Sequence, residues 1–254
     1  MSISDENVPK FFAIPETDDL SSNAHRQLIG YIGLIFPVLL WFIAGLRPAG
    51  ELPPWKPLTS VSAYYYTGAV SAFAGMLVAL ALFLFSYRGY NNAYRRRDRI
   101  AAIIAGVSAI LVAFFPTGAP DGFEALSWWT PVIGRIHHVS AVVLFGAFIF
   151  FSLFLFRRSK VKRGESLPRS KQLRNVIHLF CGVAMLACMV WAGIATVTKA
   201  PIFWPEALAL EFFAVSWLAK GRADITAVAT GRRTLYFGRH PRRLFTELRR
   251  QTTA

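Results

Sequence analysis

The last apolar stretch of the chain carries two carboxylates, Glu206 and Glu211, and Glu211 is the better placed to do chemistry. It lies seven residues after Trp204, which on a helix is about 10 Å of rise. A carboxylate at such depth in a bilayer is costly, so it normally faces a partner inside a helical bundle or takes up a proton. The expected partners are Arg135, His137 and His138. A purely structural interhelical hydrogen bond is the alternative, and the sequence leaves both open.

Two adjacent histidines are the other candidate catalytic groups. On a helix His137 and His138 point about 100° apart, so both cannot easily bind one metal ion. The chain has no His-x-x-x-His and no Glu at metalloprotease spacing. A zinc site would need one histidine and an acidic residue from another segment: Asp121, Glu206 or Glu211. We therefore predict no cofactor, with zinc as the alternative; a Ser–His pair of His137 with Ser140 is also conceivable.

The remaining polar candidates lie in the loops that the topology below brings to one side. The first loop contributes Ser60, Ser62 and a run of tyrosines, and the third contributes Asp121, Arg135 and the histidines. An apolar pocket with a few convergent polar groups is typical of a ligand site. We predict that such a site is formed by Tyr64, Tyr65, Tyr66, Arg135, Glu206 and Glu211.

The elements that position these residues are long apolar runs. The chain has 254 residues, is 54% hydrophobic, and from Val139 to Phe156 has 18 residues without a charge. Such a run nearly covers the ~30 Å hydrocarbon core of a bilayer as a helix. The apolar runs are Leu28–Leu46, Gly68–Tyr87, Ile100–Phe115, Ile136–Phe156, Val176–Val197 and Trp204–Ala219. The pattern predicts an all-α, polytopic membrane bundle of six transmembrane helices.

Basic residues predict how this bundle is threaded. The second loop, the fourth loop and the tail hold 22 Lys and Arg, whereas the first, third and fifth loops hold 4. Because cytoplasmic loops carry the excess of Lys and Arg, both termini are expected inside (N-in/C-in). The predicted organisation is a cytoplasmic N-terminal segment (1–27), a transmembrane domain (28–219) and a basic cytoplasmic tail (220–254).

Small residues recur every four positions in two of the runs, where they would let helices approach closely in lipid. They are Ser71, Gly75 and Ala79 in the second run, and Ala101, Ala105 and Ala109 in the third. We expect both sets to serve packing within the bundle, with dimerisation as the alternative.

The net charge of +14 also bears on partners. A basic chain can bind nucleic acid, but cationic loops between membrane spans explain this charge better, so no nucleic acid is expected. Each basic residue near an anionic leaflet contributes about 1 kcal/mol of attraction. We therefore expect anionic membrane lipids at the cytoplasmic face, and a membrane-protein partner is the alternative.

Several short motifs resemble a known family. The run Ser60-Val-Ser-Ala-Tyr-Tyr-Tyr-Thr67 opens the second span, Phe114-Phe-Pro-Thr117 ends the third, and His137-His-Val-Ser-Ala141 opens the fourth. Together, over Leu28 to Leu218, they resemble an uncharacterised family of bacterial multi-pass membrane proteins, a domain of unknown function with a Ser-x-Ser-x-Tyr-Tyr-Tyr-Thr motif. The resemblance implies a helical bundle in the bacterial inner membrane.

Three functions follow as expectations. The first is a non-catalytic membrane protein that binds a lipid, another apolar ligand or a membrane-protein partner within the bundle. The second is an outer-facing, lipid-modifying enzyme of hydrolase type that uses Glu211 with His137 or His138. The third is a proton-coupled carrier that uses Glu211.

Overall fold

The computed structural model describes residues 18–47, 55–87, 95–158 and 169–221, and these residues form helices and turns without a strand. The chain divides into two compact units, Met1–Ala223 and Asp224–Ala254, and all the described residues belong to the first. The expected N-terminal segment before residue 18 and the basic tail after residue 221 lie outside the described residues. The α-helices are α1 (Asp18–Leu46), α2 (Val70–Ser86), α3 (Arg95–Phe114), α4 (Pro131–Phe150), α5 (Arg169–Val197) and α6 (Phe203–Lys220).

The all-α prediction is confirmed for the described residues, and each α-helix contains the bulk of one apolar run. Three helical stretches are long and apolar enough to cross a bilayer: Ala24–Leu46, Pro131–Leu155 and Lys171–Val197. The helix Val70–Ser86 is apolar but shorter. The first five residues of α3 are Arg-Arg-Arg-Asp-Arg, and α6 carries Glu206, Glu211 and Lys220. These charges explain why α3 and α6 fall short of the same criterion.

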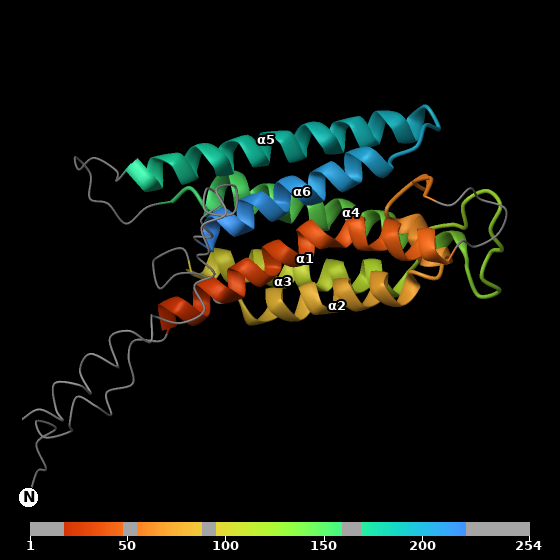
Figure 1. Cartoon of the computed structure of the whole chain (residues 1–254), viewed down its shortest axis with the longest axis horizontal. Helices are drawn as coiled ribbons and strands as arrows, with labels where there is room; N and C mark the ends of the chain where they lie inside the picture. The colour runs from red at the N-terminus through yellow and green to blue at the C-terminus, as the bar shows by residue number, and fades with distance from the viewer. Residues whose placement is uncertain (1–17, 48–54, 88–94, 159–168, 222–254) are drawn as a thin grey trace, which may run out of the picture. The chain divides into compact units, whose positions relative to one another are not determined.

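Successive helices run in alternating directions (Figure 1). Each helix contacts the next in the chain, and α6 also packs along α1, which closes the ring. Two ends result. The end with the α1–α2, α3–α4 and α5–α6 connections, residues 55–69, 115–130 and 198–202, is called the tyrosine end. The end where α1, α3 and α5 begin and α2, α4 and α6 finish is called the arginine end.

Hydrogen bonds between helices fix the arginine end. His25 near the start of α1 bonds the Ser86 hydroxyl at the end of α2, with a 2.8 Å separation between Nε2 and Oγ. The Gln27 amide donates to the Gly221 carbonyl just after α6, at 2.9 Å. The start of α1 is therefore tied to the ends of both its neighbours.

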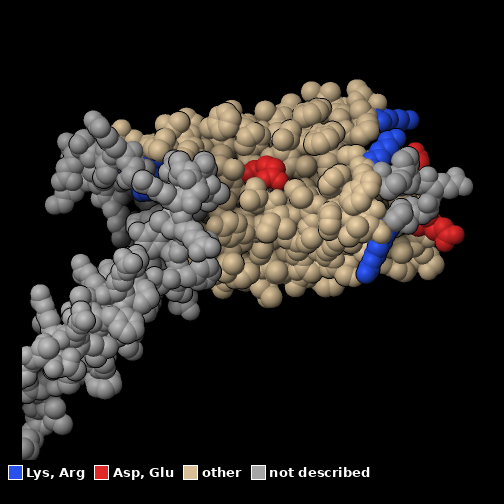
Figure 2. All heavy atoms as spheres, in the orientation of Figure 1, with Lys and Arg blue, Asp and Glu red and all other residues tan. Residues whose placement is uncertain are grey.

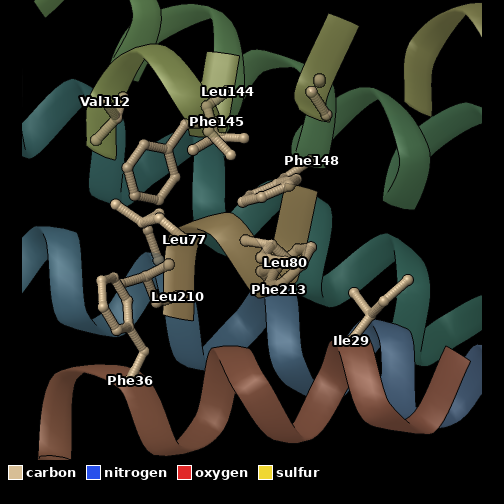
Figure 3. Packing of buried hydrophobic residues seen from close by; sticks show 14 of the residues in the cluster. Ile29, Phe36, Leu77, Leu80, Val112, Leu144, Phe145, Phe148, Leu210 and Phe213 are labelled. Atoms are coloured by element: carbon tan, nitrogen blue, oxygen red, sulfur yellow. The ribbon is translucent and has the colours of Figure 1, made fainter. Parts of the chain in front are cut away.

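The core is shared by all the helices and consists of aromatic and aliphatic side chains that point inward (Figure 3). Phe148 of α4 stacks on Phe213 of α6 with ring centroids 3.8 Å apart, and both are fully buried. In a bilayer, lipid tails are as apolar as the core, so helices associate through close packing rather than through the hydrophobic effect. Interlocking rings of this kind supply that packing.

Glycines allow the closest helix contacts. A Cβ added at Gly30 of α1 would lie 2.7 Å from Leu218 Cγ of α6, and one at Gly182 of α5 would lie 2.4 Å from Leu153 Cδ2. The alanines of α3 predicted to pack in the bundle, Ala101, Ala105 and Ala109, are buried as expected. The stripe Ser71, Gly75 and Ala79 of α2 is different, since Gly75 is exposed with no atom near an added Cβ. Packing inside the bundle therefore uses only one of the two predicted stripes.

Candidate functional site

The tyrosine end is organised by a short 3₁₀-helix, η2 (Ser62–Tyr66), between α1 and α2. Hydroxyl side chains shape it, because Ser and Thr readily bond nearby backbone. Ser60 Oγ accepts a hydrogen bond from Ala63 N at 3.0 Å. Thr67 Oγ1 donates to the Tyr64 carbonyl at 2.8 Å and accepts from Ala69 N at 3.1 Å. These hydrogen bonds fix the backbone at the two ends of η2 and just before the first residue of α2.

The three tyrosines of η2 point in different directions. The Tyr64 ring packs against Phe203 of α6, and the Tyr65 ring packs against Phe73 of α2. The Tyr66 hydroxyl donates to the Thr117 carbonyl in the α3–α4 connection at 2.6 Å. Burial raises the pKa of the Tyr66 hydroxyl, and the neighbouring Tyr65 raises it further, so Tyr66 stays a donor at neutral pH. The tyrosines therefore hold three elements together.

His137 is brought to a serine that sequence spacing could not pair with it. Its Nδ1 lies 2.7 Å from the Phe115 carbonyl and its Nε2 lies 2.9 Å from Ser62 Oγ. A carbonyl can only accept, so Nδ1 donates to it, and in the neutral imidazole Nε2 accepts from the Ser62 hydroxyl. The expected Ser140 partner is buried nearby on the same helix, but the hydrogen bond goes to Ser62. The expected topology places Ser62 on this side of the bundle, but only the fold pairs it with His137.

The other third-loop candidates face outward. His138 is exposed and bonds the Gly134 carbonyl of its own helix at 2.6 Å. Arg135 and Asp121 are exposed as well. The described residues include no group of three His, Cys, Asp or Glu side chains placed to hold a metal ion.

Glu206 ties η2 to α6. Its Oε2 accepts a hydrogen bond from Val61 N at 2.7 Å. Beside it, the backbone N–H groups of Ile202 and Phe203 both donate to the Thr59 carbonyl, at 2.7 and 3.0 Å. Three hydrogen bonds thus join the start of α6 to the segment just before η2. Glu206 uses its carboxylate to satisfy a backbone donor.

Glu211 lies on a different face of α6. It is five residues beyond Glu206, a rotation of about 140° on a helix. It lies three and seven residues beyond Leu208 and Trp204, which are exposed, and it is partly exposed itself. In the view of Figure 2, Lys and Arg lie toward the two ends of the bundle, and an acidic group lies between them among uncharged residues. Within the described residues, Glu211 makes no hydrogen bond or ion pair with Arg135, His137 or His138.

Comparison with known proteins adds no assignment. No family model matches this chain, and no match is found among curated proteins or solved structures. The resemblance to a bacterial membrane family therefore stays a prediction, and the function is argued from the geometry alone.

Replacing Glu206 should lower stability only when the acceptor oxygen is lost. Glu206→Leu leaves the buried Val61 N–H without its acceptor, which costs about 1–3 kcal/mol. That loss corresponds to a decrease of several degrees in Tm. Glu206→Gln keeps a side-chain oxygen and should stay close to the wild type. Thermal unfolding in detergent measures the difference.

Glu211→Leu is the matched control for this prediction, because it removes a carboxylate from the same helix. Since the described residues give Glu211 no bonding partner, the control should not lower Tm. Equal effects of leucine at positions 206 and 211 would contradict the structural role of Glu206.

Proposed function

We propose that this chain is a six-span protein of the bacterial inner membrane, with the arginine end in the cytoplasm and both termini inside. Three apolar helices of spanning length and the alternating helix directions support this threading. The outer side of α5 presents large apolar side chains to its surroundings, among them Val183, Val190 and Ile194. α6 lies along α1 and α5 and is largely buried, which shields most of its polar groups from acyl chains. The α3 span is short but lies between α2 and α4.

Reporter fusions test the threading. Alkaline phosphatase, which is active only outside the cytoplasm, should be active when inserted in the α3–α4 connection after Gly122. It should be inactive when inserted after Arg163 or fused after Ala254, where a green fluorescent protein should fluoresce instead. Phosphatase activity at Arg163 would reverse the proposed orientation.

We further propose that the protein is non-catalytic and binds an anionic phospholipid of the inner leaflet. The observation that carries this proposal is an apolar groove between α3 and α4, in the half of the bundle near the arginine end. Its volume is about 380 Å³, within the range of small-ligand sites. It is lined by Arg97, Ile100, Ala101, Ile104, Val143, Gly146, Ala147 and Phe150.

The composition of the groove fits one acyl chain with its phosphate. Small side chains at Ala101 and Ala147, and the bare Gly146, leave the space, while the larger apolar residues form its sides. A Cβ added at Gly146 would meet no atom within 4 Å. Arg97 is exposed and belongs to the first two turns of α3, at the arginine end. A guanidinium there can bond a lipid phosphate while the chain extends along the groove.

Filling the groove should remove the lipid. Gly146→Leu adds a side chain whose Cβ would meet no atom within 4 Å, so the variant should fold but retain less phosphatidylglycerol. Native mass spectrometry of protein taken from vesicles of equal phosphatidylglycerol and phosphatidylcholine counts the bound lipids. Arg97→Gln should reduce the preference for phosphatidylglycerol while leaving total lipid less affected.

Gly193→Leu on α5 is the matched control, because its added side chain also meets open space but lies away from the groove. It should retain as much phosphatidylglycerol as the wild type. Equal lipid retention by all three variants and the wild type would exclude the groove as the binding site.

One observation favours an enzyme as the second candidate. Ser62 is partly exposed, and its Oγ lies 2.9 Å from a histidine that the Phe115 carbonyl orients, which is the arrangement of an activated nucleophile. In a lipid-ester hydrolase, Ser62 Oγ would attack the ester carbonyl and pass its proton to His137 Nε2. The ester C–O bond would break, and His137 would return the proton to the leaving alcohol. Water would then release the acid from the acyl-serine by the same route.

This candidate replaces the expected use of Glu211 as acid or base. Glu211 is partly exposed and has no hydrogen-bond partner among the described residues, so a proton relay through it, as a carrier would need, has little support. The Ser62–His137 pair is thus the better test of catalysis.

A fluorophosphonate probe separates the two candidates, because it labels activated serines. For a non-catalytic protein we expect no labelling above that of Ser62→Ala in membranes. Labelling of the wild type and of Ser140→Ala, but not of Ser62→Ala or His137→Gln, would establish the hydrolase instead. In-gel fluorescence at matched protein amounts gives the readout.

A further inference from the structure

One face of α6 carries a carboxylate halfway along the helix. α6 lies between α1 and α5 and packs along both (Figure 1). Trp204 and Leu208 are exposed, and Glu211 and Val215 are partly exposed. These four residues follow one another at intervals of three or four, so they share one face of the helix. Glu211 stands at the middle of α6, which places its carboxylate at mid-depth of a bilayer that covers this face.

No described residue pairs with this carboxylate. Glu211 makes no hydrogen bond within the described ranges, and no charged side chain there acts on it. Glu206 of the same helix differs, because it accepts a hydrogen bond from Val61 N. An ionisable side chain inside a membrane is costly and is normally paired with another group. Glu211 therefore calls for a partner that the described part of the chain does not provide.

Apolar side chains of both neighbouring helices adjoin Glu211. Phe212, the next residue, packs its ring against that of the exposed Phe180 of α5, with centroids 5.7 Å apart. A Cβ added at Gly33 of α1 would lie 2.8 Å from Phe213 Cδ1, so α1 approaches α6 closely at this level. Leu34, which follows Gly33, is exposed. We call the following residues the acidic face: Leu34 of α1, Phe180 of α5, and Leu208, Glu211 and Phe212 of α6.

The depth of Glu211 limits what can bring it a donor. Lipid headgroups remain at the two interfaces of a bilayer, about 15 Å from its centre. A polypeptide can reach the centre as a helix, because only then are its backbone groups satisfied without water. A Lys or Arg on such a helix supplies both a positive charge and hydrogen-bond donors to a carboxylate.

We propose that the acidic face docks a transmembrane helix of a partner protein, and that a Lys or Arg in the middle of this helix pairs with Glu211. Charge complementarity carries the proposal, because each charge removes the cost of placing the other in the membrane. A second copy of this chain does not fit, since the Lys and Arg of the described helices lie toward the two ends of the bundle (Figure 2).

The acidic face is separate from the α3–α4 groove proposed to bind lipid. It is formed by α1, α5 and α6, whereas the groove is lined by α3 and α4 only. Either proposal can therefore fail without the other.

A synthetic helix serves as the probe for the partner. It is a leucine–alanine transmembrane peptide with tryptophan at both ends, one central lysine and an acceptor dye. The full chain, with a green fluorescent protein after Ala254 as donor, is reconstituted with it in phosphatidylcholine vesicles. Energy transfer measured against the peptide-to-lipid ratio gives the affinity. The lysine peptide should bind more tightly than the same peptide with a central leucine.

Variants at position 211 test whether the carboxylate is responsible. Glu211→Leu should lower the affinity for the lysine peptide to that for the leucine peptide, a loss of about tenfold. Glu211→Gln should lose part of it, since the amide oxygen still accepts a hydrogen bond. Glu206→Gln is the matched control, because it removes a carboxylate that bonds η2 instead, and it should bind the lysine peptide as the wild type does.

Exchanging the charges separates pairing from a change in folding. Glu211→Lys should lose the lysine peptide and bind a peptide with a central glutamate, which the wild type should not prefer. Equal affinity of the wild type for the lysine and leucine peptides would overturn the proposal. Energy transfer between two labelled copies of the chain that Glu211→Leu abolishes, without a preference for the lysine peptide, would assign the face to a homodimer instead.

Discussion

One constraint shapes the whole bundle: a polar group inside an apolar structure must find a partner within the protein or bring one with it. At the tyrosine end this is achieved by the protein alone. The Glu206 carboxylate accepts from Val61 N, Tyr66 donates to the Thr117 carbonyl, and His137 joins the Phe115 carbonyl to Ser62. Each bond links a side chain to an element distant in sequence. Polar residues that look like a binding site in the sequence are largely used to close this end.

The arginine end satisfies the same constraint with hydrogen bonds of the same kind. His25 bonds the Ser86 hydroxyl, Gln27 donates to the Gly221 carbonyl, and Lys171 donates to the Phe156 carbonyl. Arg97 and Asp98 of α3 are successive residues, so they point about 100° apart. Arg97 is exposed at the α3–α4 groove, whereas Asp98 is buried. One turn of α3 therefore faces both the surface and the interior of the bundle.

The helices could be predicted from the sequence because apolar runs of this length have few other stable forms. The ends of the runs nearly coincide with the ends of the helices, counting the π-helical turn η3 (Phe151–Leu155) as the continuation of α4, but α1, α3, α4 and α5 begin 10, 5, 5 and 7 residues before their runs. The partners of polar residues could not. Ser62 and His137 are 75 residues apart, and only the packing of η2 on α4 joins them. The different roles of Glu206 and Glu211 could have been predicted, because two side chains five residues apart on a helix point about 140° apart. Glu211 therefore could not share the position of Glu206 facing η2.

The balance between a binding protein and an enzyme depends on what the Ser62–His137 contact is for. A buried histidine needs a hydrogen-bond partner for each ring nitrogen. Here the Ser62 hydroxyl, 2.9 Å from Nε2, and the Phe115 carbonyl next to Nδ1 are those two partners. His137 is almost fully buried, so its burial alone accounts for both bonds. The groove combines apolar space between α3 and α4, where a Cβ added at Gly146 would meet no atom within 4 Å, with the exposed Arg97 at one end. An apolar groove with a cation beside it fits a phospholipid, and this is why we favour binding over catalysis.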